Sequence, residues 1–403
     1  MKKIVLHILL TIMTLAAWGQ KVVVSGSVVN ESTGQAIAGA SVTMGRLSVV
    51  TNDDGYFALK SNVAGSSVVV SHVGYRSQRV MLKGRSNHPL TIRLKPAAIQ
   101  LNEVLVLAEN PRNLVMTAIS KITQNYSQQP ELYRCFYREK AMKRQHYISV
   151  AEGVVDMYKT SYNRGMTRDR VAIRKGRRLL SPKQSDTLGV KVMGGPVAPI
   201  QLDLVKNTDF LLNADELDYY DLKMEVPTTI ADRQQFVVSL SPRRELPYAL
   251  YFGKLYIDQE TLAFTRAELT LDMSDREKAT QAMLVRKPIG VRFRPKEMSC
   301  IVDYRQSDDG VMRISYINTT FRFNCDWRRR LFATQFAAFC EMAVTNHTDS
   351  DVQPIRGRES FDQRDAFFDK VDYFRDPTFW QDYNIIEPTE TLDRAIDKII
   401  KKY

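Results

Sequence analysis

The chain has 403 residues, of which 44% are hydrophobic and 25% are charged. This balance excludes an intrinsically disordered chain, and the length allows two or three packed cores. The net charge is +12 at pH 7, and it is unevenly distributed. Residues 134–178 contain 13 Lys or Arg against 4 Asp or Glu, whereas residues 345–403 contain 9 against 13.

The first residues have the pattern of a cleavable export signal. Two lysines precede an apolar run at residues 4–18, which is shorter than the ~20 residues that a membrane-spanning helix needs. Ala17 and Gly19 are the small residues that signal peptidase reads. We therefore predict a signal peptide at residues 1–19 and a mature chain that begins at Gln20.

The predicted cleavage has a direct test. Intact-mass measurement of protein from the periplasmic fraction is expected to show a chain that starts at Gln20. A full-length chain retained in the inner membrane would contradict the prediction. No second long apolar run follows the leader, so no transmembrane span is expected after cleavage. Nucleic acid is not an expected partner, because export would take the protein away from it.

Short strands separated by turns follow the leader. Gly55 can adopt the positive φ that the tight turn before Tyr56 requires. Six or seven short strands at this spacing predict a β-sandwich. The expected strands cover residues 22–29, 36–42, a segment from residue 56, and residues 68–73, 78–82 and 90–94.

Several pieces of this region carry a family resemblance. They are residues 24–28, the turn at Gly34, and residues 37–42, 51–57 and 69–75. With them, residues 20–95 resemble the carboxypeptidase regulatory-like domain, a prealbumin-like β-sandwich. In that family the domain accompanies exported proteins of the Bacteroidetes type and carries no catalytic residue. The resemblance therefore implies binding and not peptidase chemistry, and residues 96–109 are expected to be a linker.

Residues 110–403 are expected to form a mixed α+β domain. Asn110 can cap a first helix, because Pro111 suits its first turn and apolar residues follow at helical spacing. Residues 160–200 are expected to be irregular. A last helix should begin after Thr389, and the aromatic residues at 379–383 that precede it should anchor this part of the chain. Strands are expected at 133–141, 147–159, 236–240, 249–258, 262–273, 297–304 and 311–323, with a short helix at 200–206.

The long strands alternate apolar and polar residues, so one face of their sheet should be buried and the other wet. This pattern predicts a mainly β fold with a long, curved antiparallel sheet packed on helices, and an open half-barrel is one form that such a sheet can take. Residues 253–268 resemble the central hairpin of lipoprotein-carrier half-barrels, which implies room for an acyl chain. A sheet filled by its own helices is the alternative. The whole region also resembles the uncharacterised partner region of regulatory-like-domain proteins, which carries no activity.

Cysteines and histidines give little sign of chemistry. Cys135, Cys300, Cys325 and Cys340 are an even number in an exported protein, so both disulfides and buried free thiols stay open. The five histidines form no His-Glu-x-x-His pair, and neither a Gly-x-Ser-x-Gly elbow nor a phosphate loop occurs. We therefore predict no catalytic residue, no metal and no cofactor.

One charged cluster remains as a candidate contact. Arg174, Lys175, Arg177 and Arg178 could meet an anionic surface, with a solvated loop as the alternative. The acidic residues at 215–218 could support glycosidase chemistry, but such clusters are common.

The sequence favours a two-domain protein of the bacterial cell envelope, in the periplasm or at the periplasmic face of the outer membrane. We expect it to act by binding or assembly, with an envelope protein, a glycan or a lipid as partner. Two alternatives stay open. One is a half-barrel that handles lipids or lipoproteins, and the other is a hydrolase with a scattered site.

Overall fold

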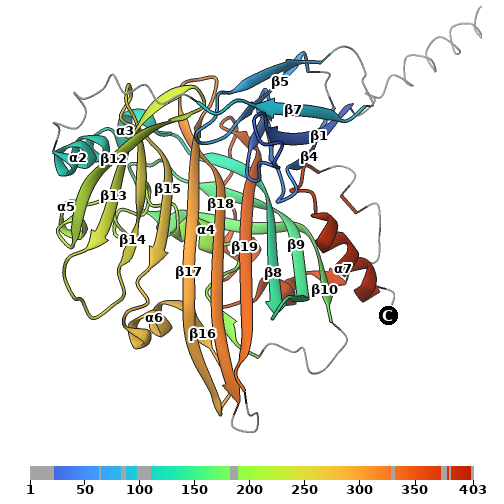
Figure 1. Ribbon diagram of the computed structural model, residues 1–403, viewed down its shortest axis with the longest axis vertical. Coiled ribbons are helices and arrows are strands. Elements are labelled where there is room, and N and C mark those ends of the chain that lie inside the picture. The colour runs from blue at the N-terminus through green and yellow to red at the C-terminus, as the bar shows by residue number, and fades with distance from the viewer. Residues whose placement is uncertain are drawn as a thin grey trace, which may run out of the picture.

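The computed structural model describes residues 22–62, 65–82, 88–97, 110–181, 189–327, 332–373, 379–380 and 383–400. A small β module, blue in Figure 1, lies against one side of a much larger open sheet. The predicted leader and most of the predicted linker lie outside the described residues. The mainly β fold, with a sandwich-like module followed by a long antiparallel sheet, is confirmed.

The module consists of two small sheets, ordered β4-β1-β7 and β3-β2-β5-β6. Alternating residues of both sheets, such as Val28, Phe57 and Val70, are fully buried between them. The strands are β1 (Val22–Asn30), β2 (Ser41–Met44), β3 (Leu47–Val50), β4 (Tyr56–Ser61), β5 (Ser67–Ser71), β6 (Gln78–Met81) and β7 (Leu90–Leu94).

One expected strand of the module is shorter than predicted. Residues 36–40 form a turn, and β2 begins only at Ser41. The Thr51 hydroxyl holds this turn, because it accepts a hydrogen bond from the Ala40 N–H at 2.8 Å and donates one to the Ile37 carbonyl at 2.6 Å. Strand β3 was not predicted at all.

In the described part of the chain the large sheet has the order β12-β13-β14-β15-β17-β18-β19-β8-β9-β10-β20. All neighbours pair antiparallel except the last two, and the sheet stays open. Its strands are β8 (Glu131–Lys143), β9 (His146–Lys159), β10 (Arg170–Leu180), β12 (Tyr220–Ile230), β13 (Arg233–Pro242), β14 (Tyr251–Asp258), β15 (Phe264–Leu271), β17 (Val291–Gln306), β18 (Met312–Trp327), β19 (Thr334–Thr348) and β20 (Asp372–Tyr373).

Helices and a two-stranded ribbon complete the fold. Asn110 caps the first helix by accepting hydrogen bonds from the N–H groups of Arg112 and Asn113, which confirms that prediction. These elements are α2 (Pro111–Ser120), α3 (Ile122–Asn125), η2 (Met166–Arg168), β11 (Lys191–Val192), α4 (Ala198–Gln201), α5 (Ala214–Leu217), α6 (Arg276–Met283), β16 (Leu284–Arg286), η4 (Gly357–Glu359), η5 (Phe367–Lys370) and α7 (Glu390–Ile400).

The two faces of the large sheet have different surroundings. On the inner face, apolar residues such as Leu269 and Val302 pack on α2, α4 and residues 202–217. On the outer face, residues such as Arg266 and Asp303 are charged, and the module lies over part of them. The predicted alternation of a buried and a polar face is therefore confirmed.

The C-terminal region passes around the β10 edge of the sheet. Phe361 and Phe367 belong to the inner-face core, and β20 then pairs with the edge of β10. Trp380 packs on the outer face beside Phe136. Helix α7, red in Figure 1, also lies on the outer face, through Leu392.

The prediction that residues 160–200 are irregular is wrong, because β10 occupies 170–180. This strand is hard to detect because it is rich in arginine. Two of its arginines pair with carboxylates of the neighbouring strand: Arg174 with Asp156 at 2.6 Å and Arg177 with Glu152 at 2.8 Å. The expected helix at 200–206 is replaced by α4, which ends at Gln201, and a run of turns.

Candidate functional site

The inner face of the sheet is not completely filled. A cavity of about 390 Å³ lies between strands β8, β9 and β19 and two crossing segments, residues 189–195 and 365–369. We call it the inner-face pocket. Its size is within the range of small-molecule sites, which begin at about 300 Å³.

The pocket exists because small side chains gather at one end of the inner face. Ala141, Ala151 and Ala338 line it from three neighbouring strands. Farther along the same strands the inward residues are large, as with Tyr137 and Met342, and they are fully buried in the core. Helices and turns therefore fill only part of this face, and the rest stays open.

A glycine lets the crossing segment approach the sheet. Gly195 has φ +87, a conformation that favours glycine, and a Cβ there would lie 3.3 Å from the Phe361 ring. Its N–H donates a 2.9 Å hydrogen bond to the Glu139 carboxylate, which also accepts one from the Tyr137 hydroxyl at 2.7 Å. Burial nevertheless raises the pKa of Glu139.

The other polar groups at the pocket are at its margin. Burial raises the pKa of the Cys340 thiol, so this side chain stays neutral at pH 7. Lys191 donates hydrogen bonds to the backbone carbonyls of Arg364 and Asp365. Apolar side chains therefore make up most of the pocket's lining, and Glu139, Ser149 and the Cys340 thiol are polar groups among them.

Exposed apolar residues lie near Arg286 in the chain, at one part of the pocket's lining. Arg286 lines the pocket, and the next residue back, Val285, is 55% exposed. Ile289, three residues on, is fully exposed. Lys287 and Arg292 are also exposed and add positive charge to the same stretch. An apolar ligand with an anionic end would find both matching groups here.

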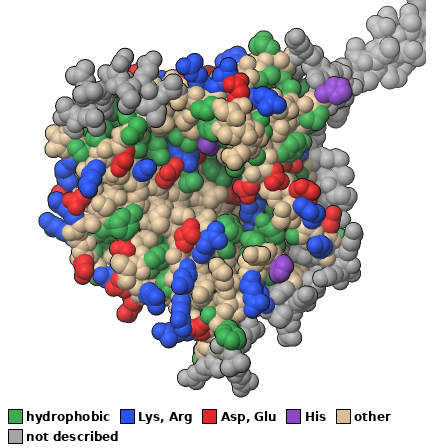
Figure 2. Space-filling model, in the orientation of Figure 1, with side chains coloured by type: hydrophobic (Ala, Val, Ile, Leu, Met, Phe, Trp, Pro, Cys, Tyr) green, Lys and Arg blue, Asp and Glu red, His purple; other side chains and the backbone are tan. Residues whose placement is uncertain are grey.

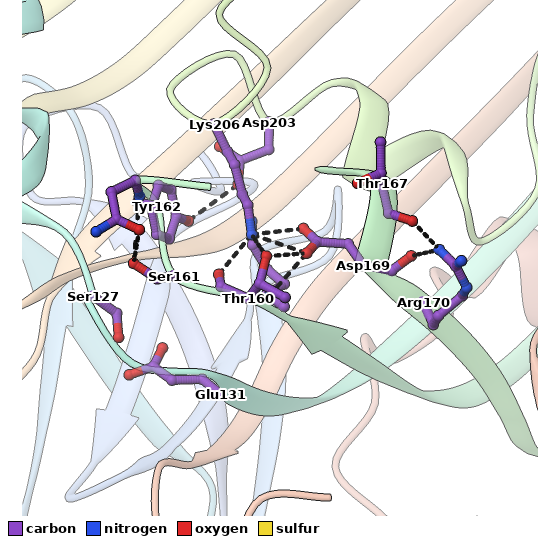
Figure 3. A network of polar contacts seen from close by, with 12 residues as sticks. Ser127, Glu131, Thr160, Ser161, Tyr162, Thr167, Asp169, Arg170, Asp203 and Lys206 are labelled. Carbon is purple, nitrogen blue, oxygen red and sulfur yellow. Dashed lines mark hydrogen bonds and ion pairs between the residues drawn. The ribbon is translucent and has the colours of Figure 1, made fainter. Parts of the chain in front are cut away.

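A buried charged network fixes the segment that fills the rest of the inner face (Figure 3). Asp203 pairs with Lys159 and accepts hydrogen bonds from the hydroxyls of Tyr162 at 3.0 Å and Tyr304 at 2.8 Å. These four side chains are at most 6% exposed. They tie the turn after α4 to β9 and β17.

A second buried ion pair extends this network. Lys206 pairs with Asp169 at 2.9 Å and donates to the Thr160 carbonyl and hydroxyl. Burial lowers the pKa of Lys206, and the positive charge of Lys159 lowers it further. These groups bond mainly to one another and to the backbone, so we assign them a positioning role.

The four basic residues suggested by the sequence are in contact with the chain itself. Arg174 and Arg177 pair with β9 carboxylates. The Lys175 amine donates to the Phe379 carbonyl at 2.7 Å, and Arg178 donates to the Phe368 carbonyl at 2.5 Å. A contact with an anionic surface stays a prediction. In the structure, Lys175 and Arg178 help to fix the C-terminal region.

Other candidate residues from the sequence lie apart. Asp215 and Glu216 belong to the single turn of α5, and Asp218 pairs with Arg112 at 2.6 Å. Cys135, Cys300, Cys325 and Cys340 are all free thiols. Within the described ranges, no group of three or more His, Cys, Asp or Glu side chains is placed to hold a metal ion. No described helix combines the length and hydropathy needed to cross a membrane.

The inner-face pocket was not found from the sequence. Its signal is the run of inward-facing alanines on β8, β9 and β19, which is visible only once the pairing of these strands is known. β19 itself was not predicted, although its residues alternate toward the inner face, as Phe336 and Met342 do.

Comparison with solved structures gives only distant likenesses. A DUF1329 family protein from Desulfovibrio piger is 10% identical, with a TM-score of 0.27, over 61% of this chain and 95% of the other. A putative outer membrane lipoprotein-sorting protein domain from Vibrio parahaemolyticus is 10% identical, with a TM-score of 0.28, over 60% and 95%. A putative membrane-associated protein of unknown function from Bacteroides fragilis is 10% identical, with a TM-score of 0.16, over 81% and 98%. At these values the function has to be argued from the residues.

Comparison with protein sequences and family models gives a match in the N-terminal part of the chain. No curated protein matches the chain. Residues 24–106 match the family model of the CarboxypepD_reg-like domain, which confirms the resemblance seen in the sequence. The association with exported Bacteroidetes proteins stays a prediction. Over these residues the N-terminal module is similar to CarboxypepD_reg-like domains.

Proposed function

We propose that this chain is a non-enzymatic binding protein of the bacterial cell envelope, and that it holds the acyl chain of a lipid or lipidated ligand in the inner-face pocket. The observation that carries the proposal is the 390 Å³ opening on an otherwise packed inner face, lined mainly by apolar side chains. Buried apolar area is the main source of affinity for such ligands, at roughly 0.8 kcal/mol for each buried methylene.

The pocket's margin supports the same ligand class. Val285 and Ile289 expose apolar surface beside Arg286 and Lys287. Basic residues next to exposed apolar ones favour contact with anionic lipid headgroups. The export signal predicted at residues 1–19 would deliver the protein to the periplasm, where such ligands occur. We also propose residues 20–95 and 110–403 as its two domains.

Filling the pocket should weaken binding. Ala338→Trp places an indole in the opening from β19, and excluding about three methylenes would weaken binding by about 2–3 kcal/mol, roughly fifty-fold. The measurement is titration of the delipidated mature protein with a fluorescent C16 fatty acid, together with native mass spectrometry of the protein as purified.

The matched control is Thr270→Trp, which adds the same side chain at an exposed position of β15. We expect this variant to bind as the wild type does. The proposal would be contradicted if the wild type does not bind the fatty acid, or if Ala338→Trp binds it as tightly as the wild type does. Thermal melts of both variants separate loss of the pocket from loss of the fold.

Assembly with an envelope protein and a scattered hydrolase site remain alternatives without a specific site. The acidic residues at 215–218 line neither the inner-face pocket nor the cavity between the module and the large sheet. No experiment on the pocket depends on them.

A further inference from the structure

The module and the outer face of the large sheet enclose a second cavity, of about 280 Å³, which we call the seam cavity. The module contributes the end of β5 and the β2–β3 hairpin, and the sheet contributes β13, β15 and β17. Figure 2 shows the corresponding side of the molecule, hollowed below the module. A polar cavity of about 220 Å³ adjoins it and shares His72, Arg266 and Asp303 as lining residues.

Two of the three arginines that line the seam cavity are already neutralised. Arg266 pairs with Glu268 and with Asp303, both at 2.7 Å. Arg233 makes a bidentate pair with Asp258, at 2.5 and 2.7 Å. Neither guanidinium therefore needs a further anion.

The third arginine differs. In the part of the chain that the structure describes, Arg305 has no carboxylate within 4.0 Å, and its hydrogen bonds go to the hydroxyls of Ser48 at 2.7 Å and Ser41 at 3.4 Å. Both bonds use Nη1, so Nε and Nη2 make no hydrogen bond to a described residue. Burial lowers the pKa of Arg305 to about 10, which still leaves it charged at pH 7.

The other lining groups suit a small hydroxylated molecule. Ser71, Thr261 and Ser315 bring hydroxyl oxygens and Val73 offers an apolar contact, whereas the Gln235 amide is bonded to Arg233 and Thr265. Burial lowers the pKa of His72, and Arg266 lowers it further, so this imidazole is neutral at pH 7. The cavity therefore combines one arginine without a carboxylate within 4.0 Å, two arginines paired with carboxylates, and neutral polar groups.

We propose that the seam cavity binds an acidic monosaccharide-sized ligand, and that Arg305 receives its carboxylate or phosphate oxygens through Nε and Nη2. A guanidinium presents its donors in a planar fork that matches either oxyanion. The ligand would bridge the module and the sheet, since Arg305 is bonded to the module through Ser48. This site is separate from the inner-face pocket and does not depend on the function proposed for it.

The test is isothermal titration of the mature protein with glucuronate, glucose 6-phosphate and glucose. We expect one or both acidic sugars to bind and the neutral sugar not to bind. Glucuronate and glucose 6-phosphate distinguish a carboxylate from a phosphate ligand. Arg305→Met should weaken binding by at least about tenfold, because it removes charge-assisted hydrogen bonds.

The matched control is Arg46→Met, which removes a cation from the same seam without lining the cavity. Arg46 is 57% exposed and pairs with Asp349 at 3.3 Å. If Arg305→Met does not fold, Ser71→Phe fills the cavity while keeping the arginine, and it should also abolish binding. No binding of either acidic sugar, equal binding of glucose, or unchanged binding in the cavity variant would overturn the proposal.

Discussion

Replacing Lys206 with methionine is expected to lower the free energy of unfolding by about 3–5 kcal/mol, because it leaves the Asp169 carboxylate buried without its partner. Lys206 and Asp169 are both inaccessible, and their ion pair joins the turn after α4 to the start of β10. The measurement is urea unfolding at pH 7, followed by intrinsic fluorescence.

A double variant shows how much of the lost stability comes from leaving the Asp169 carboxylate buried without a partner. Burial lowers the pKa of Lys206, so carrying its charge in the fold is itself unfavourable. Lys206→Met combined with Asp169→Asn should therefore recover part of the loss, since Asn keeps the Oδ1 acceptor used by the Thr160 N–H at 2.9 Å. A double variant as unstable as the single one would contradict this account. Arg364→Met should leave the unfolding midpoint unchanged, because the Arg364 side chain is 87% exposed in its pair with Asp362.

Glu152→Gln is expected to have an effect on stability that depends on pH. Burial alone would raise the pKa of Glu152, but Arg138 and Arg177 lower it to about 2, from an ordinary value of 4.5. A carboxyl with a depressed pKa stabilises the fold above its unfolded pKa. Its contribution, about 3 kcal/mol, is lost as the pH falls from about 4.5 to about 2.

The wild type and Glu152→Gln should therefore differ most in stability at pH 5–7, and the difference should shrink below pH 4.5. Urea unfolding at pH 7, 5, 4 and 3 measures it. Glu260→Gln is the control, because Glu260 is 81% exposed in its pair with Arg233. A difference between wild type and Glu152→Gln that stays constant from pH 7 to pH 3 would show that Glu152 acts through shape and not through charge.

The module was predictable because its signals are local. Turns with glycine, such as Gly55 with φ +74, mark where its strands end. In the large sheet, alternation identified β15, β17 and β18 for the same reason. Strand β10 escaped detection because its arginines suit a strand only beside the carboxylates of Asp156 and Glu152, which the pairing with β9 supplies.

The two cavities could not be predicted from the sequence for a related reason. Arg305 looks like any surface arginine on an alternating strand until the module is placed over it. Ala338 looks like an ordinary small residue until β8 and β9 are placed beside it. Each site depends on contacts between residues far apart in the chain, and the periodicity of a single segment does not predict such contacts.

The path of the C-terminal region around β10 also affects how the molecule behaves toward other copies of itself. A sheet edge with free N–H and C=O groups is a template for pairing with another chain. Here β20 pairs with β10 at Arg177 and Arg178, and Trp380 and α7 hold the following chain on the outer face. Truncation before residue 372 would uncover that edge, so a shortened protein would be exposed to self-association through β10 as well as to a loss of stability.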